Sequence, residues 1–170
     1  TQVSFAGAIT GLGGYPLVVD GNLAQIGIRE SIADTARVLG SQSAAIVWRT
    51  YGQDRIEQMA ANAGVPVVNA LTDDFHPCQI LADLLTITEH KGALAGLTTS
   101  YVGDGANNMA HSYLLGGATA GMHVRVAAPD GYQPDPAIIA AAQRIAAETG
   151  GSAAVVGDPA LAVKGADVLA

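Results

Sequence analysis

Residues 65–90 read VPVVNALTDDFHPCQILADLLTITEH. The apolar, β-branched start predicts a buried strand over residues 65–71. Over residues 77–90 the apolar side chains recur at helical spacing, and the opening proline suits the first position of a helix. Asp73 and Asp74, in the loop between, are candidate N-caps. The pattern therefore predicts a strand, a short polar loop and a helix in direct succession.

Two polar side chains stand where this predicted helix begins. His76 and Gln79 are three residues apart, so both can point to the same side of the first turn. The unpaired backbone N–H groups and the positive end of the helix dipole lie there as well. An imidazole, a carboxamide and free amides in one place suit a small polar anion that is held by hydrogen bonds.

Strand and helix patterns alternate on both sides of this stretch. The predicted strands cover residues 16–19, 44–48, 65–71, 98–102, 123–128, 153–156 and a last strand from Asp167. The predicted helices cover residues 3–12, 30–39, 53–63, 77–90, 107–119, 136–149 and 159–164. Such alternation predicts parallel sheets with right-handed crossovers. We therefore expect an α/β fold with two doubly wound parallel-sheet domains, 1–76 and 93–170, joined by a helix within 77–92.

The composition narrows the class of protein. A net charge of −7 argues against a nucleic-acid-binding surface, which needs a basic stripe. The 49% hydrophobic residues indicate a globular chain, and no apolar run is long enough to span a membrane. The single cysteine cannot form an internal disulfide, which favours a reducing cytoplasm. No histidines, cysteines and acids are spaced as metal ligands, so we expect no metal.

Polar residues follow the predicted strands at four places. They are Gln25, Arg49, the pair His76 and Gln79, and the pair Asn107 and Asn108. Ligands of open α/β sheets bind beyond the carboxyl ends of the strands, which makes these loops candidate binding loops. Taken singly, each residue also has a structural interpretation. Arg49 can be a solvated strand end, and one of the asparagines can cap the helix that follows.

Residues 103–108, GDGANN, imitate a dinucleotide-binding loop. A Gly-x-Gly follows a predicted strand and opens a helix, and Asp130 stands after the next strand as a ribose-binding acid would. Asn108, however, occupies the position of the third glycine, which normally allows close packing of the helix against the strand. The match is therefore weak, and a nucleotide-binding oxidoreductase domain is an alternative interpretation.

Two long motifs resemble those of the ornithine carbamoyltransferases, in the aspartate/ornithine carbamoyltransferase superfamily. They are FHPCQILAD at 75–83 with TITE at 86–89, and GDGANNMAHS at 103–112. A third match is QIG at 25–27, followed by ES at 30–31 and DTA at 34–36. The aspartate enzymes share a His-Pro-x-Gln core but lack the Asp-x-x-Asn-Asn pattern. The resemblance extends over essentially the whole chain.

The resemblance implies transfer of the carbamoyl group from carbamoyl phosphate to the δ-amine of L-ornithine, giving L-citrulline and phosphate for arginine biosynthesis. It implies a homotrimer in which Gln25 acts across the subunit interface, and we expect no cofactor. The implied carbamoyl-phosphate-binding residues, with Arg49 and His76 also catalytic, are Thr1, Gln25, Arg49, His76 and Gln79. Asn107 and Asn108 are the implied ornithine-binding residues.

The chain departs from the family pattern in several places. Of the family's Ser-Thr-Arg-Thr motif only Thr1 is present, and Gln2, Ala6 and Ile28 stand where Arg, Glu and Arg are common. We expect both ends to be cut, the second domain to be incomplete and the 170 residues alone to be inactive. Alternatives are transfer to another amine (putrescine, N-acylated ornithine or aspartate) and a non-catalytic regulatory subunit.

Overall fold

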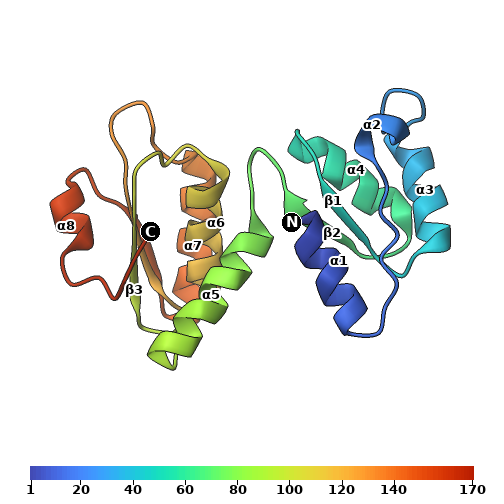
Figure 1. The fold of residues 1–170 in the computed structure, drawn as a ribbon. Coiled ribbons are helices and arrows are strands. Elements are labelled where there is room, and N and C mark those ends of the chain that lie inside the picture. The colour runs from blue at the N-terminus through green and yellow to red at the C-terminus, as the bar shows by residue number, and fades with distance from the viewer. The chain divides into compact units, whose positions relative to one another are not determined.

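The computed structural model describes residues 1–170, apart from the side chains of Asn22 and Leu23. The chain forms two compact units (Figure 1). Unit 1 consists of residues 1–48 and 54–70, and unit 2 consists of residues 49–53 and 71–170. The domain boundaries that the sequence predicts, after residues 76 and 92, stay a prediction.

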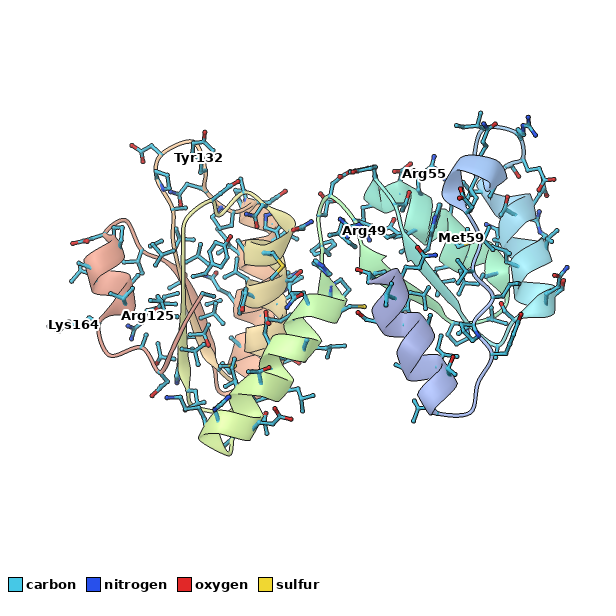
Figure 2. All side chains as sticks on the ribbon, in the orientation of Figure 1. Arg49, Arg55, Met59, Arg125, Tyr132 and Lys164 are labelled. Atoms are coloured by element: carbon cyan, nitrogen blue, oxygen red, sulfur yellow. The ribbon has the colours of Figure 1, made fainter. Side chains whose placement is uncertain are left out.

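Unit 1 combines helices with a two-stranded sheet. Its elements are α1 (Gln2–Gly11), α2 (Gly21–Ala24), α3 (Ile32–Gln42), β1 (Ile46–Arg49, its last residue in unit 2), α4 (Gln53–Ala63, its first residue in unit 2) and β2 (Val67–Leu71, its last residue in unit 2). Strands β1 and β2 are neighbours, and the N–H of Ile46 bonds to the carbonyl of Pro66. The buried core contains Ile32 and Ala36 of α3, Ile46 of β1, and Met59 and Ala63 of α4 (Met59 is labelled in Figure 2).

Helix α3 both begins and ends later than the predicted range 30–39. The Ser31 hydroxyl accepts the N–H of Asp34 at 3.0 Å, which is an N-cap, and Asp34 pairs with Arg37 at 2.8 Å. We expected the helix to stop before Gly40, but it runs on to Gln42. A Cβ at Gly40 would collide with the carbonyl of Ala63, so this glycine allows α3 to approach the end of α4. It serves packing and does not end the helix.

The strand predicted over residues 16–19 is wrong. Residues 14–20 form neither helix nor strand, and the side chains of Leu17, Val18 and Val19 are 58%, 54% and 46% exposed. No strand within the described chain pairs with them. A run of apolar β-formers becomes a strand only when a neighbouring strand accepts its backbone hydrogen bonds. The loop predicted over residues 20–27 contains the short helix α2.

Unit 2 has a four-stranded parallel sheet in the order β5-β4-β3-β6. Its strands are β3 (Thr98–Val102), β4 (His123–Ala127), β5 (Ser152–Val155) and β6 (Val168–Leu169). Its helices are α5 (Pro77–Lys91), α6 (Asn108–Thr119), α7 (Pro136–Thr149) and α8 (Pro159–Val163). Helices α6 and α7 cover one face and α8 lies on the other (Figure 1). The predicted α/β fold with parallel sheets is confirmed.

The core of unit 2 lies between the sheet and helices α6 and α7. Leu114, Val124 and Val126 are fully buried there, and each contributes roughly 1.5–3 kcal/mol of transfer free energy. Ala142 and Ala146 present a small-residue face of α7 to the same cluster, which lets the two helices pack closely. The loop between β3 and α6 follows the carboxyl end of β3, an inner strand of this sheet. None of the helices that the structure describes is long and apolar enough to span a membrane.

Candidate functional site

Two strand-end loops of unit 2 are bonded to each other. One is the segment from the end of β1 to the start of α4, residues 49–53, and the other is the loop after β2, residues 72–76. The N–H of Gly52 donates to the carboxylate of Asp73 at 2.6 Å, and the buried hydroxyl of Thr72 donates to the side chain of Gln53 at 2.7 Å. These bonds hold the segment that starts with Arg49 beside the segment that ends with His76.

His76 is the N-cap residue of α5, but its side chain makes no capping bond. Its backbone N–H donates to the hydroxyl of Ser112 at 2.7 Å. The ring Nδ1 is buried and has no hydrogen-bond partner among the described residues. The predicted caps, Asp73 and Asp74, are wrong because Asp73 binds the neighbouring loop instead. The imidazole is therefore located at a helix N-terminus without being used by the helix.

The electrostatics of His76 favour its neutral form. Burial lowers the pKa of the imidazole below 6.5, and the nearby Arg49 guanidinium lowers it further, while Asp83 opposes the shift. Arg49 itself is exposed at the end of β1, where Figure 2 labels it. At neutral pH the ring thus offers one N–H donor and one nitrogen acceptor. An arginine and a neutral histidine in bonded loops can act on one small anionic ligand.

Gln79 follows in the first turn of α5. Its amide Nε2 donates to Asp83 Oδ1 at 2.9 Å, one helical turn further on. The other carboxylate oxygen, Asp83 Oδ2, accepts the hydroxyl of Tyr113 from α6 at 2.7 Å. Gln79 is exposed, Asp83 is half-buried and Tyr113 is buried. The carboxamide of Gln79 therefore belongs to an exposed residue, and it is held in position by Asp83, which is held in turn by Tyr113.

The two predicted asparagines have different surroundings. Asn107 is the N-cap of α6, where its Oδ1 accepts from the N–H groups of Met109 and Ala110 at 2.9 and 3.0 Å. Its Nδ2 donates to the hydroxyl of Tyr101 at 3.1 Å. Asn108 Nδ2 donates to the carbonyl of Thr72 at 2.8 Å. The expectation that one asparagine caps the helix is confirmed for Asn107, and Asn108 lies against the loop that carries His76.

The glycine loop before α6 is packed against protein. A Cβ at Gly105 would lie 2.9 Å from Pro134 Cδ, 2.9 Å from the carbonyl oxygen of Tyr132 and 3.0 Å from Ala128 Cβ. In a dinucleotide-binding loop the second glycine leaves space for the pyrophosphate. Here that space faces the chain after β4, whose Tyr132 is labelled in Figure 2. The geometry therefore does not favour the nucleotide-binding alternative.

Thr1 and Gln25 belong to unit 1. Thr1 precedes α1 as its N-cap residue without a side-chain capping bond. Gln25 has a φ of 44°, a left-handed conformation that is uncommon for a residue with a side chain. Its carbonyl accepts the N–H groups of Ile28 and Arg29. A hollow of about 320 Å³ in the same unit is lined by Val19, Ala24, Arg29, Glu30, Thr35, Val38 and Leu39, and contains no predicted site residue.

Three further residues support the site and were not among the predicted site residues. Buried His111 places Nδ1 3.2 Å from the carbonyl of Asp74, and its Nε2 accepts the N–H of Asp135 at 3.2 Å. Ser112 accepts the N–H of His76 and donates to the carbonyl of Asn108 at 2.7 Å. Asp83 is the third. A clue was present for all three, because Asp83 ends the motif FHPCQILAD, and His111 and Ser112 end the motif GDGANNMAHS.

No group of three histidine, cysteine or acidic side chains that could hold a metal is found in the part of the chain that the structure describes. The residues described above offer hydrogen-bonding groups, the Arg49 guanidinium and the His76 imidazole for binding a ligand. They suit an anion with both acceptor and donor groups.

Two family models match the chain. The carbamoyl-phosphate-binding domain of aspartate/ornithine carbamoyltransferases matches residues 1–89, and the aspartate/ornithine-binding domain matches residues 95–170. Two similar relatives are the ornithine carbamoyltransferases of Clavibacter sepedonicus and Mycobacterium ulcerans, 64% and 59% identical over 169 residues. In both cases the match covers 99% of this chain and 55% of the relative. The chain thus spans about half the length of the curated relatives it matches.

Solved structures agree with the sequence matches. The ornithine carbamoyltransferase from Pyrococcus furiosus is 48% identical, with a TM-score of 0.94, and the match covers 99% of this chain and 53% of that one. The enzyme from Gloeobacter violaceus is also 48% identical, with a TM-score of 0.89 and coverages of 99% and 55%. Together the two family models account for almost every residue of the chain. The chain belongs to the aspartate/ornithine carbamoyltransferase family.

Proposed function

We propose that these residues are part of an ornithine carbamoyltransferase, which transfers the carbamoyl group of carbamoyl phosphate to the δ-amine of L-ornithine. The products are L-citrulline and phosphate. The observation that carries the proposal is the pairing of Arg49 with a neutral His76 in two loops that are bonded to each other. The names of the similar relatives support ornithine as the amine.

Arg49 binds the phosphate end of the substrate. Its guanidinium presents several N–H donors in one plane, so it can bridge a phosphate oxygen and the carbonyl oxygen of the same molecule. Thr1 adds its hydroxyl and the amides of the first turn of α1, which attract an anion. Gln25 reaches the phosphate of a neighbouring subunit, which makes the working protein a homotrimer. Each of these groups lowers the free energy of a bound dianion.

His76 acts on the carbonyl group. The δ-nitrogen of ornithine attacks the carbonyl carbon, the bond from that carbon to the bridging phosphate oxygen breaks, and the proton of the amine passes to phosphate or solvent. Negative charge grows on the carbonyl oxygen during the attack, and the N–H of the neutral imidazole donates to it. One preorganised donor of this kind lowers the barrier by roughly 3 kcal/mol. The lowered pKa of His76 suits this role, because the ring stays a neutral donor at pH 7.

The remaining residues orient the two reactants. Gln79 accepts a hydrogen bond from the carbamoyl NH₂ and so fixes the plane of the carbamoyl group. Asn108 binds the amino-acid end of ornithine, while Asn107 holds the start of the helix that carries Asn108. Neither a cofactor nor a covalent intermediate takes part. We place carbamoyl phosphate in residues 1–76 and ornithine in residues 93–170, and we infer a cytoplasmic enzyme from its single cysteine.

Calorimetric titration of the full-length protein with carbamoyl phosphate tests the first half of the proposal. Arg49→Ala should weaken binding by about 10- to 100-fold, the range expected when a charged hydrogen-bonding group is lost. The matched control is Arg144→Ala, which removes an exposed arginine from α7 and should leave binding unchanged. Equal affinities for wild type and Arg49→Ala would contradict the proposal.

The choice of amine needs a second measurement. Full-length protein is given carbamoyl phosphate with equal concentrations of ornithine, putrescine, N-acetylornithine and aspartate, and the carbamoylated products are quantified by mass spectrometry. Citrulline should dominate. A larger yield of any other product would replace ornithine as the substrate while leaving the carbamoyl-phosphate site intact.

A further inference from the structure

A chain of hydrogen bonds runs from the exposed Gln79 into the interior of unit 2. Gln79 Nε2 donates to Asp83 Oδ1 at 2.9 Å, and Asp83 Oδ2 accepts from the hydroxyl of Tyr113 at 2.7 Å. Gln79 and Asp83 are one turn apart on α5, whereas Tyr113 comes from α6 and stacks at a tilt on Tyr101, with 5.8 Å between ring centroids. Each oxygen of the carboxylate therefore has a partner, and the two partners come from different helices.

The chemistry of this chain determines which way the Gln79 carboxamide points. A carboxylate can only accept hydrogen bonds, so the group of Gln79 that faces Asp83 must be its NH₂. The carbonyl Oε1 then points away from Asp83. Without the carboxylate, the amide could rotate by half a turn at little cost, because its oxygen and nitrogen ends have nearly the same shape.

Tyr113 keeps Asp83 in place. Burial raises the pKa of the Tyr113 hydroxyl, and the neighbouring Asp83 raises it further, so the phenol stays protonated and remains a donor. The ring is buried and packed, which leaves the hydroxyl little freedom to leave the carboxylate. The buried Tyr113 consequently holds Asp83 through one carboxylate oxygen, and the other carboxylate oxygen holds Gln79.

We propose that Asp83 is a positioning residue that makes Gln79 a hydrogen-bond acceptor toward the substrate, so that the site selects an acyl phosphate carrying an NH₂ group over one carrying a methyl group. The proposal rests on the proposed function, in which Gln79 contacts the carbamoyl group. Carbamoyl phosphate and acetyl phosphate have nearly the same size and the same phosphate. They differ in that the NH₂ of the carbamoyl group can donate to Gln79 Oε1, whereas the methyl of the acetyl group cannot.

The test compares two ligands on the full-length enzyme. The KM for carbamoyl phosphate and the inhibition constant of acetyl phosphate are measured for wild type and for Asp83→Asn, which has the same shape but an amide that can both donate and accept. The KM for carbamoyl phosphate should rise by about tenfold, the effect of one lost hydrogen bond, so the ratio of the acetyl phosphate inhibition constant to this KM should fall by the same factor. We expect the change in the KM for carbamoyl phosphate, with kcat and the acetyl phosphate constant nearly unaltered.

Two further variants separate positioning from general damage. Tyr113→Phe keeps the carboxylate but removes its anchor, and should shift the ratio in the same direction by a smaller factor. Glu89→Gln, which neutralises an exposed carboxylate elsewhere on α5, should leave the ratio unchanged. A double-mutant cycle completes the set, because Asp83→Asn should have no further effect on the ratio once Gln79→Leu has removed the amide.

The outcomes distinguish this inference from the proposed function. An unchanged ratio in Asp83→Asn would overturn the inference, and so would a change that persists in the Gln79→Leu background. Wild-type enzyme that fails to use carbamoyl phosphate at all would overturn the proposed function itself. Asp83 would be established as the positioning residue if Asp83→Asn changed the ratio of the two constants in the wild-type background but not in the Gln79→Leu background.

Discussion

Helices α5 and α6 begin in similar ways, but the side chains of their N-cap residues make different contacts. Each follows a strand-end loop of unit 2, and each has a polar N-cap residue. At α6, Asn107 gives its oxygen to two helix amides and its nitrogen to Tyr101. At α5, His76 makes no capping bond, and its Nδ1 has no partner among the described residues. A polar residue that its own helix does not use is available to a ligand.

The different contacts of the two N-cap residues also predict different effects when each residue is replaced. Replacing Asn107 removes bonds that the folded chain makes with itself. Replacing His76 removes a side chain whose ring the helix does not need. We therefore expect changes at the start of α6 to appear in the free energy of unfolding, and changes at the start of α5 to appear in turnover.

The largest effect should follow from His76→Ala. Turnover of the full-length enzyme should fall by roughly 10²- to 10³-fold because one preorganised donor to the carbonyl oxygen is lost. The free energy of unfolding should change by no more than about 1 kcal/mol. Steady-state kinetics and urea unfolding measure the two quantities, with His90→Ala at the exposed end of α5 as control. If His76→Ala lowered the free energy of unfolding enough to explain the loss of turnover, the proposed difference between the starts of α5 and α6 would be wrong.

Gly105→Ala tests whether the loop before α6 is packed rather than open. Its new methyl group would meet Pro134 and the carbonyl of Tyr132 at 2.9 Å, so the free energy of unfolding should fall by about 1–3 kcal/mol. Gly157→Ala is the matched control, because a Cβ there has no neighbour within 4 Å. Equal stability of the two variants would mean that the loop can open, as a ligand-binding glycine loop does.

Asn107→Ala should lower the free energy of unfolding by about 1 kcal/mol, the usual effect of losing an N-cap. Asn107→Asp keeps an oxygen for the amides of Met109 and Ala110, and should recover most of that stability. Urea unfolding of the three proteins measures both values. If the Asn107→Asp variant were as unstable as the Asn107→Ala variant, the capping role assigned to Asn107 would be wrong.

The smallest effect is a shift in titration. NMR of the His76 ring should show a midpoint below 6.5, and Arg49→Gln should move it upward because the second cause of the lowered pKa is gone. The unfolded state then binds more protons than the folded state just below pH 6.5. The stabilising contribution of neutral His76 is complete above pH 6.5 and is lost as the pH falls toward the folded-state pKa. A midpoint at or above 6.5 in wild type would contradict the burial and the influence of Arg49.

Local patterns were enough to predict most elements. The helices over 53–63 and 136–149 and the strand over 98–102 have the predicted bounds, because apolar spacing and flanking glycine or proline determine them locally. The strand over 16–19 failed because pairing with another strand is not a local property. Gly40 was misread for a similar reason, since its role depends on Ala63 of another helix.

The site could be predicted only in part. The strand-end positions of Arg49 and His76 follow from alternation, and the structure places both in unit 2. The supports of the site depend on residues far apart in the sequence. Tyr113 reaches Asp83 across 30 positions, and His111 reaches Asp74 across 37. No spacing rule connects such pairs, so the anchoring of Asp83 by Tyr113 could not be foreseen, whereas the bond from Gln79 to Asp83 follows the four-residue spacing of a helix within one motif.

The Ser112 hydroxyl has a consequence for the geometry of the reaction. Its oxygen receives the backbone N–H of His76, and its proton goes to the backbone of Asn108. One side chain thereby sets the spacing of two main-chain segments, which in the proposed function lie beside the acyl group and beside the amine. In that proposed arrangement, hydrogen-bonded backbone positions the nucleophile relative to the carbonyl carbon, so less rotational freedom has to be lost when both reactants are bound.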